Sequence, residues 1–280
     1  MTTQVQPKDQ TVNVNGINLH YLDWGNEGNP VVVLLHGLRG HAHSWDDVSA
    51  ALCANHHVLA LDQRGRGDTD WAADSDYSGS AYVGDLVGFC EALKLESFIL
   101  VGHSMGGLNS MAFAGSHAKM LQKLVIVDIG PTVDPRGGER ITRELRQVPE
   151  EFESFEAVVD HMGQHNRFAS DRVLRRRLQY ATKALVNGKV GWRYDLGTIR
   201  DQRVNGTGAP AADLWPLLPN ITCPTLIVRG KESDLLPADV AAKMIKTLPN
   251  GSVVEVERAG HMVFEDNPEG FISAVKGWLA

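Results

Sequence analysis

Cysteine is scarce in this chain of 280 residues, which contains three, at positions 53, 90 and 223. They stand singly among apolar or helix-forming neighbours, without the paired spacing of a disulfide framework. Long hydrophobic runs are missing too, because no segment approaches the roughly 18 apolar residues that a membrane helix needs. We therefore expect reduced core cysteines in a cytoplasmic protein that does not enter a membrane.

Positive charge is also in short supply. The 34 aspartates and glutamates outnumber the 27 lysines and arginines, which gives a net charge of −7 with neutral histidines. No basic stripe with interleaved aromatic residues is present, so a nucleic-acid partner is not expected. The first ten residues contain neither an apolar segment nor a cleavage site of small residues, so a secretory signal is not expected either.

Strand and helix patterns alternate over the first half of the chain. The alternating stretch 11–24, around the turn Asn15-Gly16, predicts an antiparallel hairpin at a sheet edge. The runs that follow are apolar except for Asp128 near the end of the last one, which is typical of strands covered on both faces: 31–35, 58–61, 98–101 and 124–129. Helical segments between them imply right-handed crossovers and a mostly parallel sheet.

The pattern changes between about residues 132 and 216. This segment is richer in charge, lacks buried strands and has helical stretches at 154–163 and 170–186. A strand then returns at 225–228, with a helix, a strand and a last helix after it. Because α/β folds place ligand-facing elements beyond the carboxyl ends of their strands, we interpret 132–216 as an inserted helical cap. The core then consists of 1–131 and 217–280.

Ser104 stands on the turn between the apolar run 98–101 and a helical stretch. The pentapeptide Gly102-His103-Ser104-Met105-Gly106 has the G-x-S-x-G pattern, in the strand-turn-helix context of a nucleophile elbow. Such a turn holds its serine in a strained conformation, and glycines on both sides allow strand and helix to approach closely. An ordinary tight turn with a solvated serine has the same composition, so the pentapeptide alone leaves both interpretations open.

Two further features accompany the pentapeptide. His36-Gly37 follows the run 31–35 as an oxyanion loop does, and His261 lies in a glycine-flanked loop near the C-terminus. With these features the chain resembles the α/β-hydrolase superfamily over essentially its whole length, in its serine hydrolase branch with a helical cap. The resemblance implies an α/β-hydrolase fold, with a mostly parallel eight-stranded sheet flanked by helices.

The predicted general base is His261, because its loop follows the final strand at the same sheet edge as Ser104. The carboxylate that orients this base is open between Asp234 and Asp128. Asp234 gives the order Ser, Asp, His that the family usually has. The family most often places this Asp three residues after the glycine, where this chain has Ser233, and some relatives use the position of Asp128. Between the two we prefer Asp234.

The remaining site residues follow from the resemblance and from their neighbours. The backbone N–H groups of Leu38 and Met105 are the predicted oxyanion-hole donors. His36 is expected to brace the oxyanion loop, and His103 to be tied to the strained turn and to point elsewhere. The charged loop 62–70 is expected to brace its own surroundings.

The spacing of His41 and His43 could suggest a metal, but no cysteine or carboxylate cluster accompanies them. No metal and no cofactor are therefore expected.

These residues predict a serine hydrolase that cleaves a carboxylic ester or lactone through an acyl-enzyme. Serine at 104 counts against the haloalkane dehalogenase and epoxide hydrolase branches, which carry Asp there. One alternative is a hydrolase of a small catabolic acid, which cleaves a carbon–carbon, enamide or amide bond; Arg39, Arg136 or Arg167 would then supply a basic pocket residue. Another is a ligand sensor with an intact triad. The expected partner is a small ester, lactone or acid, and a homodimer is compatible with the sequence.

Overall fold

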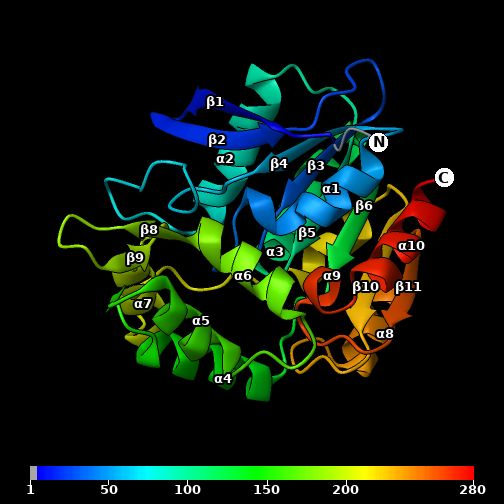
Figure 1. Ribbon diagram of the computed structural model, residues 1–280. Helices are drawn as coiled ribbons and strands as arrows, with labels where there is room; N and C mark the ends of the chain where they lie inside the picture. The colour runs from blue at the N-terminus through cyan, green and yellow to red at the C-terminus, as the bar shows by residue number, and fades with distance from the viewer. Residues whose placement is uncertain (1–4) are drawn as a thin grey trace.

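The computed structural model describes residues 5–280. Residues 1–4, part of the first ten residues in which no secretory signal is expected, lie outside the described part. At the centre is one sheet of eight strands, in the order β1-β2-β4-β3-β5-β6-β10-β11 (Figure 1). Its strands are β1 Lys8–Val14, β2 Ile17–Asp23, β3 Val31–Leu35, β4 His57–Leu61, β5 Phe98–His103, β6 Leu121–Val127, β10 Thr225–Gly230 and β11 Gly251–Val256.

The sheet is mostly parallel, as expected. Only β1 with β2 and β2 with β4 pair antiparallel, and every other neighbouring pair among these eight strands is parallel. The hairpin predicted around Asn15-Gly16 is confirmed as the sheet edge. Both turn residues have positive φ, 52° and 79°, which matches the twist that a two-residue hairpin loop needs.

Helices cover both faces of the sheet, because successive side chains of each strand point to opposite sides. In β3, Val33 and Leu35 belong to one buried apolar cluster, and Val32 and Leu34 to the other. The first cluster includes residues of α2 Gly79–Ala92, α3 Met105–His117 and α8 Ala238–Thr247. The second includes residues of α1 Asp46–Leu52, α9 Val263–Asp266 and α10 Pro268–Leu279.

A few smaller features complete the core. Short 3-10 turns occupy Ala42–Trp45, Ala118–Met120 and Trp215–Asn220. Cys53, Cys90 and Cys223 are all buried, and none of them is bonded to another cysteine. Over residues 5–280, no helix combines the length and the apolar character required to cross a bilayer.

The segment of the chain that follows β6 and precedes β10 forms a separate layer on one side of the molecule (Figure 1). It has its own apolar cluster, which includes Leu145, Val158 and Leu178. Its helices are α4 Pro135–Gln147, α5 Phe155–Gly163, α6 Asp171–Ala181 and α7 Leu196–Val204. The cap boundaries at 132 and 216 stay a prediction.

Two expectations for this layer are wrong. A small antiparallel sheet is present, in the order β7-β9-β8, formed by β7 Glu151–Phe152, β8 Thr182–Ala184 and β9 Val190–Trp192. These strands are two or three residues long, which is too short to give a recognisable alternation. The helix expected over 170–186 ends at Ala181, because Thr182, Lys183 and Ala184 pair with β9 instead.

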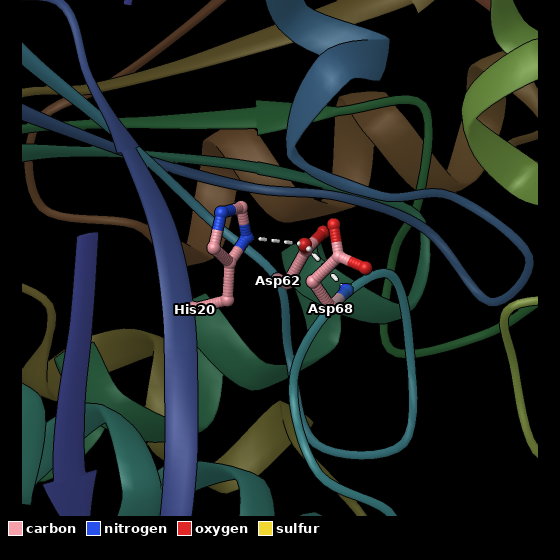
Figure 2. A group of neighbouring side chains, drawn as sticks. All are labelled: His20, Asp62 and Asp68. Atoms are coloured by element: carbon pink, nitrogen blue, oxygen red, sulfur yellow. Dashed lines mark hydrogen bonds and ion pairs between the residues drawn. The ribbon is translucent and has the colours of Figure 1, made fainter. Parts of the chain in front are cut away.

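The charged loop after β4 is braced by its own side chains, as predicted. Arg64 forms a buried ion pair with Asp85, at 2.6 and 2.7 Å, and donates to the Asp76 carbonyl. Figure 2 shows Asp62 between His20 and Asp68: Oδ2 of Asp62 lies 2.7 Å from Nδ1 of His20 and accepts the backbone N–H of Asp68. Asp62 thereby ties the loop to β2.

The His20–Asp62 pair predicts a pH dependence of stability. Burial lowers the pKa of His20, but hydrogen bonds and charge from Asp62 and Asp9 outweigh it and raise the pKa above its usual value. The pairing of protonated His20 with Asp62 therefore stabilises the fold fully below the unfolded-state pKa of about 6.5. This stabilisation is lost as pH rises through the folded-state pKa. The free energy of unfolding of the wild type should exceed that of His20→Gln by about 2 kcal/mol at pH 5.5, and by less at pH 9. Urea unfolding at the two pH values measures this difference. A pH-independent difference contradicts this assignment.

Candidate active site

Ser104 occupies the turn between β5 and α3, as predicted. Its backbone has φ 53° and ψ −118°, a strained conformation for a residue other than glycine. A Cβ on Gly102 would stand 2.3 Å from the carbonyl oxygen of Gly106, and one on Gly106 would stand 2.4 Å from that of Leu35. Only glycines fit here, so the tight contact of α3 with β5 and β3 holds the serine in its strained turn.

His261 lies in the loop after β11, and it lines the same cavity as Ser104. The volume of this cavity is about 440 Å³. The structure thus brings together the two residues whose pairing the sequence predicted from opposite parts of the chain. Within residues 5–280, no hydrogen bond joins the Ser104 hydroxyl to the His261 ring, so the contact that proton transfer requires is not yet formed.

Asp128 is the carboxylate that holds His261. Nδ1 of His261 donates to Oδ2 of Asp128 at 3.0 Å, and the carboxylate is fully buried at the end of β6. The N–H of Gly230 donates to Oδ1 at 2.9 Å, and the hydroxyl of Ser233 to Oδ2 at 2.5 Å. Because a carboxylate only accepts, the proton is on Nδ1, and Nε2 keeps a lone pair.

The preference for Asp234 as this carboxylate is therefore wrong. Its oxygens accept from Nε and Nη2 of Arg140 on α4, at 2.5 and 2.9 Å. The hydrogen bond from Arg140 is the largest cause that lowers the pKa of Asp234. One feature of the sequence already counted against Asp234: Ser233 occupies the position where the family usually has this aspartate. In the structure the hydroxyl of Ser233 contacts the carboxylate of Asp128.

His103 corrects a second expectation, because it does not point away from the site. A carbonyl only accepts, so Nε2 of His103 donates to the backbone carbonyl of His261, at 2.9 Å. The two rings lie 4.6 Å apart between centroids. Burial holds the pKa of His103 well below its usual value, so the ring is neutral. His103 therefore positions the loop of His261.

The predicted oxyanion-hole donors lie beside Ser104. Met105 is the first residue of α3, where backbone N–H groups have no partner in the helix and the helix dipole favours negative charge. Leu38 follows Gly37, which packs against His103 and Ser104. Among the residues that the structure describes, neither N–H donates a hydrogen bond. Their role toward an oxyanion stays a prediction.

His36 braces the oxyanion loop, as predicted. Its Nδ1 donates to the carbonyl of Gly37 at 2.7 Å, and its Nε2 accepts the backbone N–H of Gln63 at 3.0 Å. Burial lowers the pKa of His36 to about 4, so it stays neutral at physiological pH.

Arginines surround the rest of the cavity. Arg39 pairs with Glu144 on α4 at 2.5 Å, and Arg167 pairs with Glu232 at 3.4 Å. Arg143 also lines the cavity, and within the described chain no carboxylate pairs with it. Arg136 is exposed, pairs with Asp134 and does not line the cavity.

One cluster of side chains has the residue types that bind metal ions, but its members form hydrogen bonds with one another. Ligand-type atoms of His20, Asp62 and Asp68 lie within 4.8 Å of one another (Figure 2). Asp62 already accepts the Ala42 N–H at 2.6 Å, in addition to its bonds with the other two. Those bonds use three of the about four lone-pair sites of the Asp62 carboxylate.

The rings of His41 and His43, whose spacing could suggest a metal, have contacts of their own. Nε2 of His41 lies 2.9 Å from the carbonyl of Arg177, and the ring of His43 stacks on Tyr180 with centroids 3.5 Å apart. Both contacts join the segment after β3 to α6, which contains Arg177 and Tyr180.

Comparison with known proteins agrees with this fold. The model of the alpha/beta hydrolase family matches residues 32–274. The chain is 33% identical over 254 residues, 86% of each chain, to the 3-hydroxybutyrate-oligomer hydrolase of Cupriavidus necator. It is 31% identical to Esterase Rv0045c of Mycobacterium tuberculosis, over 92% of this chain and 85% of that one. It is 30% identical to the N-formylmaleamate deformylase of Pseudomonas putida, over 96% and 95%. The chain belongs to the alpha/beta hydrolase family.

Proposed function

We propose that this hydrolase cleaves a carboxylic ester or lactone through an acyl-enzyme on Ser104. One observation carries the proposal: the hydrogen bond of 3.0 Å from His261 to the buried Asp128, in a cavity that also contains the strained Ser104. A serine hydroxyl is nearly unreactive at neutral pH, so it needs a base, and the base needs a carboxylate to fix its tautomer. The esterase among the relatives supports the same chemistry.

The reaction begins when Oγ of Ser104 attacks the carbonyl carbon of the substrate. Nε2 of His261 takes the hydroxyl proton, and the charge of Asp128 stabilises the imidazolium that forms. The carbonyl oxygen becomes an oxyanion, which accepts the N–H groups of Leu38 and Met105. The imidazolium then gives its proton to the leaving alcohol oxygen. Water, deprotonated by the same nitrogen, releases the acid and restores the serine.

Replacement of the nucleophile tests the proposal directly. Ser104→Ala should abolish labelling by a fluorophosphonate probe and lower the turnover of p-nitrophenyl acetate by about 10⁵-fold or more, because no acyl-enzyme can form. Steady-state kinetics and mass spectrometry of the labelled protein measure both. A wild type that is not labelled, or a variant that keeps its turnover, contradicts the proposal. Very slow wild-type turnover, with melting shifts on ligand addition, would favour a sensor.

The carboxylate assignment has a paired test. Asp128→Asn should lower kcat by up to ~10⁴-fold and leave the fold intact, because the amide favours the wrong tautomer of His261. Asp234→Asn breaks only a part-exposed ion pair with Arg140, worth about 1 kcal/mol or less, and should keep near-normal activity. The reverse ranking would restore Asp234 as the acid.

An exchange of positions sharpens this test. Ser233 Oγ lies 2.5 Å from the Asp128 oxygen that His261 contacts, so a carboxylate at 233 would stand close to the same ring. The double variant Asp128→Ser with Ser233→Asp should be at least about tenfold more active than Asp128→Ser alone. An exchange without recovery means that the backbone at 233 cannot aim a carboxylate at Nδ1.

A second candidate is a hydrolase of a small catabolic acid, which cleaves a carbon–carbon, enamide or amide bond. Arg143 on α4 favours it, because this exposed residue lines the cavity and has no protein carboxylate paired with it within residues 5–280. An arginine binds a carboxylate through two parallel hydrogen bonds. The names of two relatives, the hydroxybutyrate-oligomer hydrolase and the formylmaleamate deformylase, refer to derivatives of acids.

Charge selectivity separates the two candidates. Arg143→Met should lower kcat/KM about tenfold for the mono-p-nitrophenyl ester of a dicarboxylic acid, and leave p-nitrophenyl butyrate unaffected, because only the first offers a carboxylate to Arg143. Arg136→Met, on the same helix but outside the cavity, is the matched control and should change neither value. Equal losses on both substrates would count against an acid-binding role.

A further inference from the structure

Arg66 is a buried cation without a carboxylate partner. It stands in the loop after β4 with 1% of its surface exposed, and within residues 5–280 no acidic side chain forms an ion pair with it. Arg64, two residues earlier, has such a partner in Asp85. An uncompensated buried charge is costly, so the position calls for an explanation.

The contacts of Arg66 lead to the predicted oxyanion hole. Its Nε donates to the carbonyl of Leu38 at 3.1 Å, and its Nη2 lies 3.6 Å from the sulfur of Met105. Leu38 and Met105 are the two residues whose N–H groups are the predicted donors. They come from different segments, the loop after β3 and the start of α3, and this one guanidinium touches both.

The remaining contacts satisfy the guanidinium without neutralising it. Nη1 donates to the carbonyl of Arg64 at 2.8 Å and to the hydroxyl of Tyr82. The guanidinium carbon lies 5.2 Å from the ring centroid of Tyr77 and 5.4 Å from that of Tyr82, within cation–π range. Dipoles and π faces leave the full positive charge in place, and a charge in a buried, low-dielectric site acts strongly on its surroundings.

We propose that Arg66 is a positioning residue of the oxyanion hole. It fixes Leu38 and Met105 relative to each other, and it places a positive charge behind the two N–H donors. Both effects favour the negative charge that develops on the substrate oxygen over the neutral substrate. The inference rests on the proposed serine chemistry and adds a residue of the charged loop 62–70, which the sequence analysis treated only as a local brace.

The test compares a transition-state analogue with a substrate. A trifluoromethyl ketone accepts Oγ of Ser104 at its carbonyl carbon, the hydroxyl proton passes to His261, and the resulting oxyanion occupies the hole. Arg66→Met should lower kcat/KM for p-nitrophenyl butyrate about 10–100-fold and raise Ki of the ketone by the same factor, while KM changes less than about threefold. A merely structural brace would lower the melting temperature without this parallel.

Two further variants keep the result interpretable. Arg66→Lys retains the charge but cannot reach Leu38 and Met105 together, so it should show the same parallel with a smaller loss, and it decides the question if Arg66→Met does not fold. Arg200→Met is the matched control, because Arg200 on α7 also donates to backbone carbonyls, those of Leu145 and Val148, but within residues 5–280 no hydrogen bond joins it to Leu38 or Met105. It should lose stability and keep kcat/KM and Ki.

The outcomes separate this proposal from the one it rests on. Turnover that survives in Ser104→Ala ends both proposals. If Ser104→Ala is inactive while folded Arg66 variants keep wild-type kcat/KM and Ki, only the role of Arg66 is overturned. Losses in KM alone overturn it as well, because they would place the effect on substrate binding rather than on the oxyanion.

Discussion

The buried carboxylate of Asp128 is the group on which the site depends. A fully buried ionised group must be compensated, and its three donors come from three separate segments: Gly230 at the end of β10, Ser233 in the next loop, and His261 after β11. Loss of this carboxylate would leave those donors without their acceptor. The orientation of the His261 ring is thus tied to the folding of the second half of the core.

Strand order explains why these segments meet. β5 lies between β3 and β6, and β10 and β11 follow in the same sheet. Because the strands are parallel, their carboxyl ends share one edge, and the loops there appear in a fixed sequence. The oxyanion loop stands on one side of Ser104, and Asp128 and then His261 stand on the other. Neighbours in the sheet, rather than in the chain, define the site.

The sequence predicts most of the core because buried parallel strands have continuous apolar runs and helices have their own period. It predicts Ser104 and His261 for the same reason: both stand at strand ends, where topology decides what is adjacent. Asp234 and Asp128 also stand at strand ends, so topology could not choose between them. The direction of one side chain decides: Arg140 on α4 forms the ion pair with Asp234, and His261 contacts Asp128.

His103 and Arg66 escape prediction on other grounds. His103 acts on a backbone carbonyl, and any residue offers one, so no pattern marks the partner. Arg66 contacts a carbonyl and a thioether on segments that are 28 and 39 positions away. Contacts of this kind carry no complementary charge that could be recognised in the sequence. The small strands β7, β8 and β9 escape prediction because two or three residues are too few to show an alternation of apolar and polar side chains.

Helix α4 contributes residues to the cavity and contacts the loops that contain Arg39 and Asp234. Glu144 accepts from Arg39, the residue after Leu38, and Arg140 holds Asp234, the residue after Ser233. Helix α4 therefore contacts the loops on both sides of Ser104. Since part-exposed ion pairs contribute little stability each, this connection serves orientation more than strength. Arg39, Arg140 and Glu144 all line the cavity, so its polarity depends on α4 and on the loop after β3 together.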